Sequence, residues 1–307
     1  RGRETLEDLR GASVVVGATR LVVFQGVLAI AAFGQYTFWT QPPLHVDRNF
    51  YGTFRVVEED GVRRLMHGST QHGSQYTDPA RLYEPLTYFS VGGCLHDTYD
   101  LTDTGPRSIA VLGLGAGVVA SFLGAEDRLD FFEIDPGNEP IAREWFTFLD
   151  ATPATTRVLV GDGRLKLLSE GSGPYALIHL DAFSGDGIPT HLLTKEAVEG
   201  YLSQLEPGGH ILFHISNRYY DLRPVVASLA EANGLNVVYS PPGGTAICAV
   251  ASKDDLAPFV GRGWNPDPPL LPKGTLWTDD YVNVLSALWW GMGESYALQA
   301  DLARKHR

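Results

Sequence analysis

The chain has 307 residues, of which 44% are hydrophobic and 20% are charged. These proportions are ordinary for a globular protein and exclude a disordered tail, a collagen and a disulfide scaffold. Asp and Glu number 36 against 24 Lys and Arg, which gives a formal net charge of −12. A nucleic acid is therefore not an expected partner, because phosphate binding needs a basic surface.

Residues 1–40 form a polar lead-in followed by an apolar segment. The stretch 21–39, LVVFQGVLAIAAFGQYTFW, carries no charge and is long enough to cross a bilayer core as a helix. Tyr36, Phe38 and Trp39 at its end are typical of an interfacial aromatic belt. We predict membrane attachment through residues 13–39, and the alternative is an apolar helix packed on the folded domain.

Residues 41–100 are expected to form a small β-rich N-terminal domain. Residues 49–70 contain two strand-like runs, and Asp60-Gly61 between them is a strong hairpin signal. A helix-like stretch through Tyr83 to Tyr88, punctuated by Pro79 and Pro85, leads out of this domain.

Between residues 101 and 255, short apolar strands alternate with helical stretches, as in SIAVLGLGAG, LDFFEID, RVLVGD, YALIHLDAF and HILFHIS. Two final strands, 235–240 and 245–252, are expected to pair antiparallel. This alternation predicts an α/β domain with a mostly parallel sheet covered by helices on both faces. Residues 256–307 are expected to form a Pro-rich and helical extension.

The two cysteines, Cys94 and Cys248, lie in apolar or small-residue surroundings. No CxxC or clustered Cys/His spacing is present, so no metal site is expected. We interpret the pair as two buried free thiols and keep a disulfide between them as the alternative.

Ligands of open α/β sheets bind at the carboxyl ends of the strands, and glycines mark the first such end here. Gly113, Gly115 and Gly117 form a turn that lets the backbone approach a ligand closely. Val118 stands where the dinucleotide motif GxGxxG has its last glycine, so the spacing favours an adenosyl ligand over NAD.

Acidic residues follow at the next strand ends. Glu133 can accept both hydroxyls of a ribose, with Asp135 as the neighbouring alternative. In GDG, Asp162 with Gly163 can accept the exocyclic amine of an adenine, or can simply form an Asx turn.

The fourth strand end carries Asp181, within HLDAFSGDGIPTHLL. A carboxylate in such a cleft can take a proton from an attacking amine, or hold a cation beside a sulfonium. Asp186 lies five residues further on and gives the loop a second acid. The alternative for both is a loop-capping role.

Taken together and in this order, NFYGTFRV, RRLMHGSTQHGSQY, LGLGAG, FFEIDP, VGDGR, LDAFSGDGIPTHLLT and HISNRYYDL resemble the spermidine synthase (polyamine aminopropyltransferase) family. The segment 49–253 is most similar to the family's bacterial branch, in which this domain follows a membrane module. The resemblance implies a Rossmann-like adenosyl-binding domain after a small β-domain. It also implies transfer of an aminopropyl group from decarboxylated S-adenosylmethionine, or S-adenosylmethionine itself, to a small amine, with release of methylthioadenosine.

The resemblance also implies roles for individual residues. Glu133 matches the ribose-binding acid, Asp162 the adenine-binding acid, and Gln71 a glutamine that lines the donor site. Asp181 matches the acid that accepts the proton of the amine, and Tyr83 the tyrosine that orients that amine.

Three departures concern the amine-binding half of the site. Ala116 stands where the family has an acid that binds the donor's amino group, Ser184 replaces a second acid, and Pro241 replaces a tyrosine. Residues expected to rebuild this half are His67, His72, Ser184, Asn217 and Arg218, with Asp186 as a substitute acid. Arg218 better suits a carboxylate, such as that of S-adenosylmethionine, because like charges repel.

Two other functions stay open. One is a different S-adenosylmethionine enzyme, either a methyltransferase or one that cleaves the donor to methylthioadenosine. The other is a non-catalytic ligand-sensing domain on a membrane protein. For the leading hypothesis, a transferase, we expect a cytoplasmic domain and a homo-oligomer.

Overall fold

The computed structural model describes residues 20–30, 42–102, 105–182, 187, 189–217, 219–242, 244, 246–266 and 276–288. The chain divides into two compact units, Arg1–Leu44 and His45–Arg307. In the first unit, residues 20–30 are helical, and their large apolar side chains are exposed, from 53% for Leu28 to 74% for Ile30. No helix among the described residues is long and apolar enough to cross a membrane. Residues 31–39 of the predicted segment lie outside the described residues.

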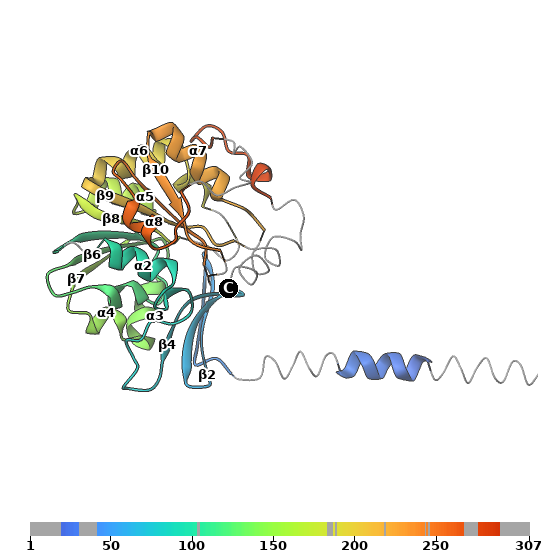
Figure 1. Ribbon diagram of the computed structural model, residues 1–307. Coiled ribbons are helices and arrows are strands. Elements are labelled where there is room, and N and C mark those ends of the chain that lie inside the picture. The colour runs from blue at the N-terminus through green and yellow to red at the C-terminus, as the bar shows by residue number, and fades with distance from the viewer. Residues whose placement is uncertain are drawn as a thin grey trace, which may run out of the picture. The chain divides into compact units, whose positions relative to one another are not determined.

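The second unit begins with a four-stranded antiparallel sheet in the order β1-β2-β3-β4 (Figure 1). Its strands are β1 (His45–Asn49), β2 (Gly52–Glu59), β3 (Val62–His67) and β4 (Thr70–Tyr76). The predicted hairpin at Asp60-Gly61 is confirmed, since Glu59 pairs with Val62 and both turn residues have positive φ, 53° and 71°. A two-residue turn of this kind matches the twist of the two strands that it joins.

The main sheet has seven strands in the order β10-β11-β9-β8-β5-β6-β7. They are β5 (Ser108–Leu112), β6 (Arg128–Glu133), β7 (Thr155–Val160), β8 (Tyr175–Leu180), β9 (Leu205–His214), β10 (Asn236–Tyr239) and β11 (Cys248–Ser252). Strands β5 to β9 are parallel, and β10 and β11 pair antiparallel, as the sequence predicts. The chain winds outward from β5 in both directions, so the switch point between β5 and β8 opens a crevice at their carboxyl ends.

Helices cover both faces of this sheet because its strands are apolar on both sides. On β5, Ile109 and Val111 belong to one hydrophobic core, and Ala110 and Leu112 belong to the other. The first core lies under α2 (Cys94–Leu101), α3 (Asn138–Trp145), α4 (Phe148–Ala151) and α8 (Ala257–Gly261). The second lies under α5 (Gly163–Glu170), α6 (Lys195–Gln204) and α7 (Arg223–Asn233) (Figure 1). The Rossmann-like architecture is therefore confirmed, and a domain boundary at residue 100 stays a prediction.

Several connections are shorter or less regular than the sequence predicts. The stretch between Pro79 and Tyr88 forms turns and a short 3-10 helix, η1 (Thr87–Phe89), because two prolines interrupt it and Thr87 has a positive φ of 58°. The helix after the glycine turn is also a 3-10 helix, η2 (Val118–Phe122). Two further short 3-10 helices are η3 (Thr190–Leu192) and η4 (Val284–Ala287).

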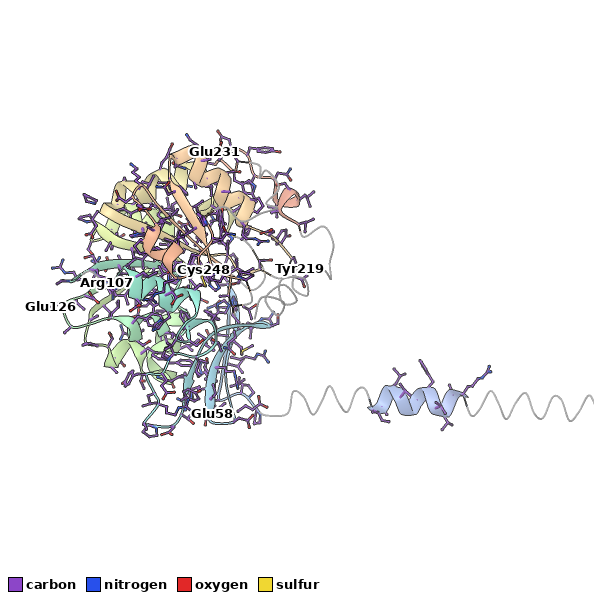
Figure 2. The ribbon with its side chains drawn as sticks, viewed as in Figure 1. Glu58, Arg107, Glu126, Tyr219, Glu231 and Cys248 are labelled. Carbon is purple, nitrogen blue, oxygen red and sulfur yellow. A yellow bond between two sulfur atoms is a disulfide. The ribbon has the colours of Figure 1, made fainter. Side chains whose placement is uncertain are left out.

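The prediction of two free thiols is wrong, because Cys94 and Cys248 form a disulfide with Cα atoms 6.0 Å apart. The bond joins the start of α2 to β11, and both cysteines are buried. Figure 2 shows Cys248 well inside the molecule. The two residues are 154 positions apart, so only the packing of α2 beside β11 brings them together.

Candidate active site

A cavity of about 240 Å³ opens at the carboxyl ends of β5, β6 and β8. Its walls come from the N-terminal sheet, from the glycine turn after β5, from the segment after β6, and from the segments after β8. The lining residues are Tyr51, Phe54, His67, His72, Leu112, Gly113, Leu114, Gly115, Phe132, Glu133, Ile134, Asp135, Asn138, Gly163, Asp181, Ala182, Pro189, His191 and Leu192.

The glycine turn brings three elements closer together than any side chain would allow. A Cβ on Gly113 would lie 2.3 Å from the carbonyl oxygen of Asp181, and one on Gly115 would lie 2.4 Å from that of His72. Both glycines also have positive φ. Gly117 lines no part of the cavity and packs against Leu149. The turn therefore holds the carboxyl ends of β5 and β8 against β4 and leaves backbone exposed to the cavity.

Glu133 ends β6 and faces the cavity with a fixed carboxylate. Its Oε2 accepts hydrogen bonds from Leu114 N and Asn138 Nδ2, each at 3.0 Å, and its Oε1 accepts one from Asp135 N at 2.9 Å. The Asn138 Oδ1 atom is buried in the cavity wall and has no hydrogen-bond partner among the described residues. The pair therefore offers acceptors for hydroxyl groups of a ligand.

Asp135 also lines the cavity, and its two oxygens, like those of Glu133, accept hydrogen bonds within the protein. Asn49 Nδ2 donates to Oδ1 at 2.7 Å and to Oδ2 at 2.9 Å, and Gly137 N donates to Oδ1. This contact ties the end of β1 to the end of β6. Glu133 and Asp135 thus each accept three hydrogen bonds within the protein, and the choice of Glu133 over Asp135 as the ribose-binding acid stays a prediction.

Asp162 lies beside the cavity rather than in its wall, whereas Gly163 lines it. The Asp162 carboxylate caps α5 by accepting a hydrogen bond from Leu165 N at 3.0 Å. Its other oxygen lies 3.1 Å from His191 Nε2. Asp162 therefore caps a helix, where the alternative from the sequence was an Asx turn, and a role toward adenine stays a proposal.

Asp181 follows β8, and its carboxylate is largely buried, with 17% of the side chain exposed. Burial alone would raise its pKa, but His214 Nδ1, 2.6 Å from Oδ1, and the neighbouring rings of His179 and His72 outweigh that effect. The pKa of Asp181 therefore lies below its usual value, and the group is ionised at neutral pH.

Two histidines of the N-terminal sheet face this carboxylate side of the cavity. His67 stacks on Phe54, with ring centroids 4.5 Å apart, and its Nε2 lies 3.1 Å from Tyr51 O. Burial lowers the pKa of His72 to about 4, and its Nε2 has no hydrogen-bond partner among the described residues. His72 is therefore neutral at pH 7, and it lines the cavity with a buried ring nitrogen that has no partner among the described residues.

A tyrosine other than the predicted one packs on His214, the hydrogen-bond partner of this acid. Tyr83 is 49% exposed and lines no part of the cavity. Tyr88 instead packs on His214, with ring centroids 5.1 Å apart, and burial and the charge of Asp181 raise its pKa well above 10. Irregular turns around Pro85 and Thr87 determine which tyrosine faces His214. The sequence has no periodic pattern there from which the direction of the side chains could be predicted.

The other predicted residues that the structure describes, Gln71 and Asn217, do not line the cavity. Gln71 is half-buried on β4, and Asn217 holds a turn by accepting hydrogen bonds from Tyr219 N and Tyr220 N. Ala116 buries its methyl group, and its N–H donates to His72 O. Ser184, Asp186 and Arg218 lie outside the described residues.

The charge of the cavity favours a cationic ligand. Three acids line it, Glu133, Asp135 and Asp181, and its described walls include no Lys or Arg. A sulfonium or ammonium group placed there is stabilised by carboxylates in a site of low dielectric constant. The arrangement can therefore bind a nucleoside through hydroxyl groups at one end and accept a proton at the other.

Comparisons with known proteins confirm the resemblance to the spermidine synthase family. The chain is 33% identical over 164 residues to a polyamine aminopropyltransferase of Vibrio vulnificus (strain CMCP6), covering 50% of this chain and 52% of that protein. It is 30% identical over 115 residues to a putative O-methyltransferase of Mycolicibacterium vanbaalenii, covering 36% of this chain and 48% of that protein. The chain thus spans about half the length of the curated relatives that it matches.

The fold is also similar to that of a spermidine synthase. A probable spermidine synthase from Corynebacterium glutamicum ATCC 13032 superposes with a TM-score of 0.55 at 19% identity, covering 70% of this chain and 82% of that one. No family model matches the chain. The similarity to spermidine synthases therefore extends from sequence to fold, and the membrane module of the predicted branch stays a prediction.

Proposed function

We propose that this chain is an aminopropyltransferase of the spermidine synthase type. The observation that carries the proposal is Asp181, an ionised and oriented carboxylate at the switch point of the sheet, which lines the same cavity as Glu133. The relative from Vibrio vulnificus, named as a polyamine aminopropyltransferase, supports it. The donor would be decarboxylated S-adenosylmethionine, with S-adenosylmethionine as the alternative.

In this proposal each end of the cavity has a distinct task. Glu133 accepts hydrogen bonds from the ribose hydroxyls, and the glycine turn lets the nucleoside approach the backbone. The lone pair of the acceptor amine attacks the methylene carbon next to the sulfonium, and the carbon–sulfur bond breaks with its electron pair going to sulfur. Asp181 takes the proton that the amine loses, and methylthioadenosine leaves. Holding the two reactants together supplies much of the rate.

A methyltransferase is the second candidate, and one observation favours it. Ala116, with its buried methyl group, provides no carboxylate at the glycine turn for the amino group of an aminopropyl donor. The product identifies the reaction: methylthioadenosine without an aminopropylated amine indicates cleavage of the donor, S-adenosylhomocysteine indicates methyl transfer, and neither product indicates a sensing role.

The test is incubation of the purified chain with each donor and a series of aliphatic diamines, followed by mass spectrometry of the products. We expect methylthioadenosine and an aminopropylated diamine. Asp181→Asn should keep the affinity for methylthioadenosine but lower single-turnover rates by about 10²- to 10⁴-fold, because it removes the proton acceptor. A rate close to that of the unmodified chain would leave Asp181 without a catalytic role.

Membrane attachment through residues 13–39, a cytoplasmic location and a homo-oligomer are further parts of this proposal. The uncharged stretch 21–39 supports the first of these. Flotation of the whole chain with lipid vesicles, compared with a chain that begins at residue 42, tests it. Equal behaviour of the two chains would contradict attachment through this segment.

A further inference from the structure

His214 lies beside Asp181 because of the register of two parallel strands. Leu180 of β8 pairs with Phe213 of β9, so the next residue of each strand projects from the same edge of the sheet. His214 Nδ1 lies 2.6 Å from Asp181 Oδ1. No described residue hydrogen-bonds Asp181 Oδ2, and Asp181 lines the cavity, so this second oxygen is available to a ligand.

Asp181 and Ser216 contact the two ring nitrogens of His214 from opposite sides of the ring. The Ser216 Oγ atom accepts a hydrogen bond from Ile247 N at 2.8 Å and lies 2.9 Å from His214 Nε2. The ionised carboxylate of Asp181 can only accept, so Nδ1 carries a proton, and the Ser216 hydroxyl can donate its own proton to Nε2. The network therefore assigns the tautomer in which Nδ1–H donates to the carboxylate.

This pair is enclosed by groups that carry no charge at neutral pH. The titratable side chains that face Asp181 besides His214 are His72 of β4, Tyr88 of η1, Tyr99 of α2 and His179 of β8. The two histidines have pKa values of about 4, and both tyrosines have pKa values well above 10. His214 is thus the described side chain that stabilises this carboxylate by a direct hydrogen bond.

We propose that His214 is the positioning residue for Asp181: its Nδ1–H holds Oδ1 of the carboxylate, Ser216 holds the imidazole in that tautomer, and Oδ2 is left to receive the proton of the substrate. This inference rests on the proposed function in that the substrate is an amine. In the reaction, the amine N–H bond breaks and the proton passes to Oδ2, while His214 keeps its own proton. Such a donor favours the charged form of a buried base and so offsets the cost of its burial.

Two substitutions separate this role from simple packing. In His214→Asn the side-chain amide nitrogen occupies the place of Nδ1 and can still donate to Asp181. In His214→Gln the amide lies one bond further out, where it reaches Ser216 but not Asp181. His214→Leu removes both contacts. Ser216→Ala removes the hydrogen bond to Nε2, so that either ring nitrogen can carry the proton. His45→Asn, on β1 outside the cavity wall, is the control.

The first readout is the titration of Asp181 by carbon NMR of the side-chain carboxyl group, with Asp181→Asn to assign the signal. We expect the midpoint to rise by about one pH unit or more in His214→Gln and His214→Leu, and to stay near that of the unmodified chain in His214→Asn and His45→Asn. The midpoint in Ser216→Ala should lie between those of His214→Asn and His214→Gln. Equal midpoints in His214→Asn and His214→Gln would overturn the proposal, and the comparison holds even if His214→Leu does not fold.

The second readout is turnover. We expect kcat about tenfold or more lower in His214→Gln than in His214→Asn, with the acid limb of the pH profile moved to higher pH and KM for the donor unchanged. If the unmodified chain forms no methylthioadenosine, the proposed function fails, whereas the NMR titration still decides the role of His214. Losses of kcat that follow only the melting temperatures would contradict a positioning role.

Discussion

Glu133 anchors the adenosyl end of the proposed site, and its carboxylate is held by two backbone N–H groups and one amide. In Glu133→Gln, one of the two side-chain oxygens becomes an N–H₂ group, which faces donors and can no longer accept from a ribose. We expect the affinity for methylthioadenosine to fall by on the order of 100-fold, since hydrogen bonds to a charged group contribute about 1.5–3 kcal/mol each. Isothermal calorimetry measures the change.

The matched control is Glu139→Gln on α3, where the acid pairs with Arg143 on the surface. This variant should bind methylthioadenosine as the unmodified chain does. An unchanged affinity in Glu133→Gln would mean that the ribose is held elsewhere.

Residue by residue, the sequence predicts the acids of this site better than their partners. Glu133 and Asp181 could be found because each directly follows an apolar parallel strand, and such strand ends share one edge of a sheet. His214 was missed, although it ends a strand too, because its role depends on the pairing of β8 with β9. The motif HISNRYYDL covers that strand end, but it predicts Asn217 and Arg218 rather than His214 as site residues.

At the scale of elements, the disulfide between Cys94 and Cys248 joins α2 to the strand next to β9, where Cys248 lies opposite His214. Breaking it frees a loop of 154 residues in the unfolded chain. We expect Cys94→Ser combined with Cys248→Ser to lower the free energy of unfolding by about 5 kcal/mol, the value that chain entropy gives for a loop of this length. Urea denaturation measures it.

Dithiothreitol provides the control for this prediction. The unmodified chain should lose stability when the reductant is added, and the double variant should not respond to it. Equal denaturation midpoints for the unmodified chain with and without dithiothreitol would contradict a stabilising disulfide.

The elements themselves divide into those with a regular pattern and those without one. Apolar strands separated by helices predict the main sheet, because the period and the burial of such strands are visible in the chain. The connection between Pro79 and Tyr88 has no such period, and its path depends on turns and on packing against the main domain. The disulfide depends on contact between α2 and β11, which residue spacing does not reveal.

The whole molecule should lose stability on mild acidification because it buries neutral histidines. His72 and His179 have folded-state pKa values of about 4, against 6.5 for an exposed histidine, and burial is the main cause for both. Between pH 6.5 and 4 the unfolded chain therefore binds protons that the folded chain does not, so stability falls as the pH falls. Carboxylates with lowered pKa values, such as Asp130 at about 2, also stabilise the folded chain. Their contribution is lost only as the pH falls below 3.8, so it does not affect the slope above that pH.

Each of these two histidines should contribute a loss on the order of 3 kcal/mol by pH 4, which is the pKa shift expressed as free energy. Urea denaturation between pH 7.5 and 4 should show this slope in the unmodified chain. His179→Gln, which leaves an uncharged polar side chain beside Tyr99, should show about half of the loss that the two histidines cause together. A variant with the full slope of the unmodified chain would mean that His179 is protonated in the folded protein, and that the region beneath Asp181 carries charge at acidic pH.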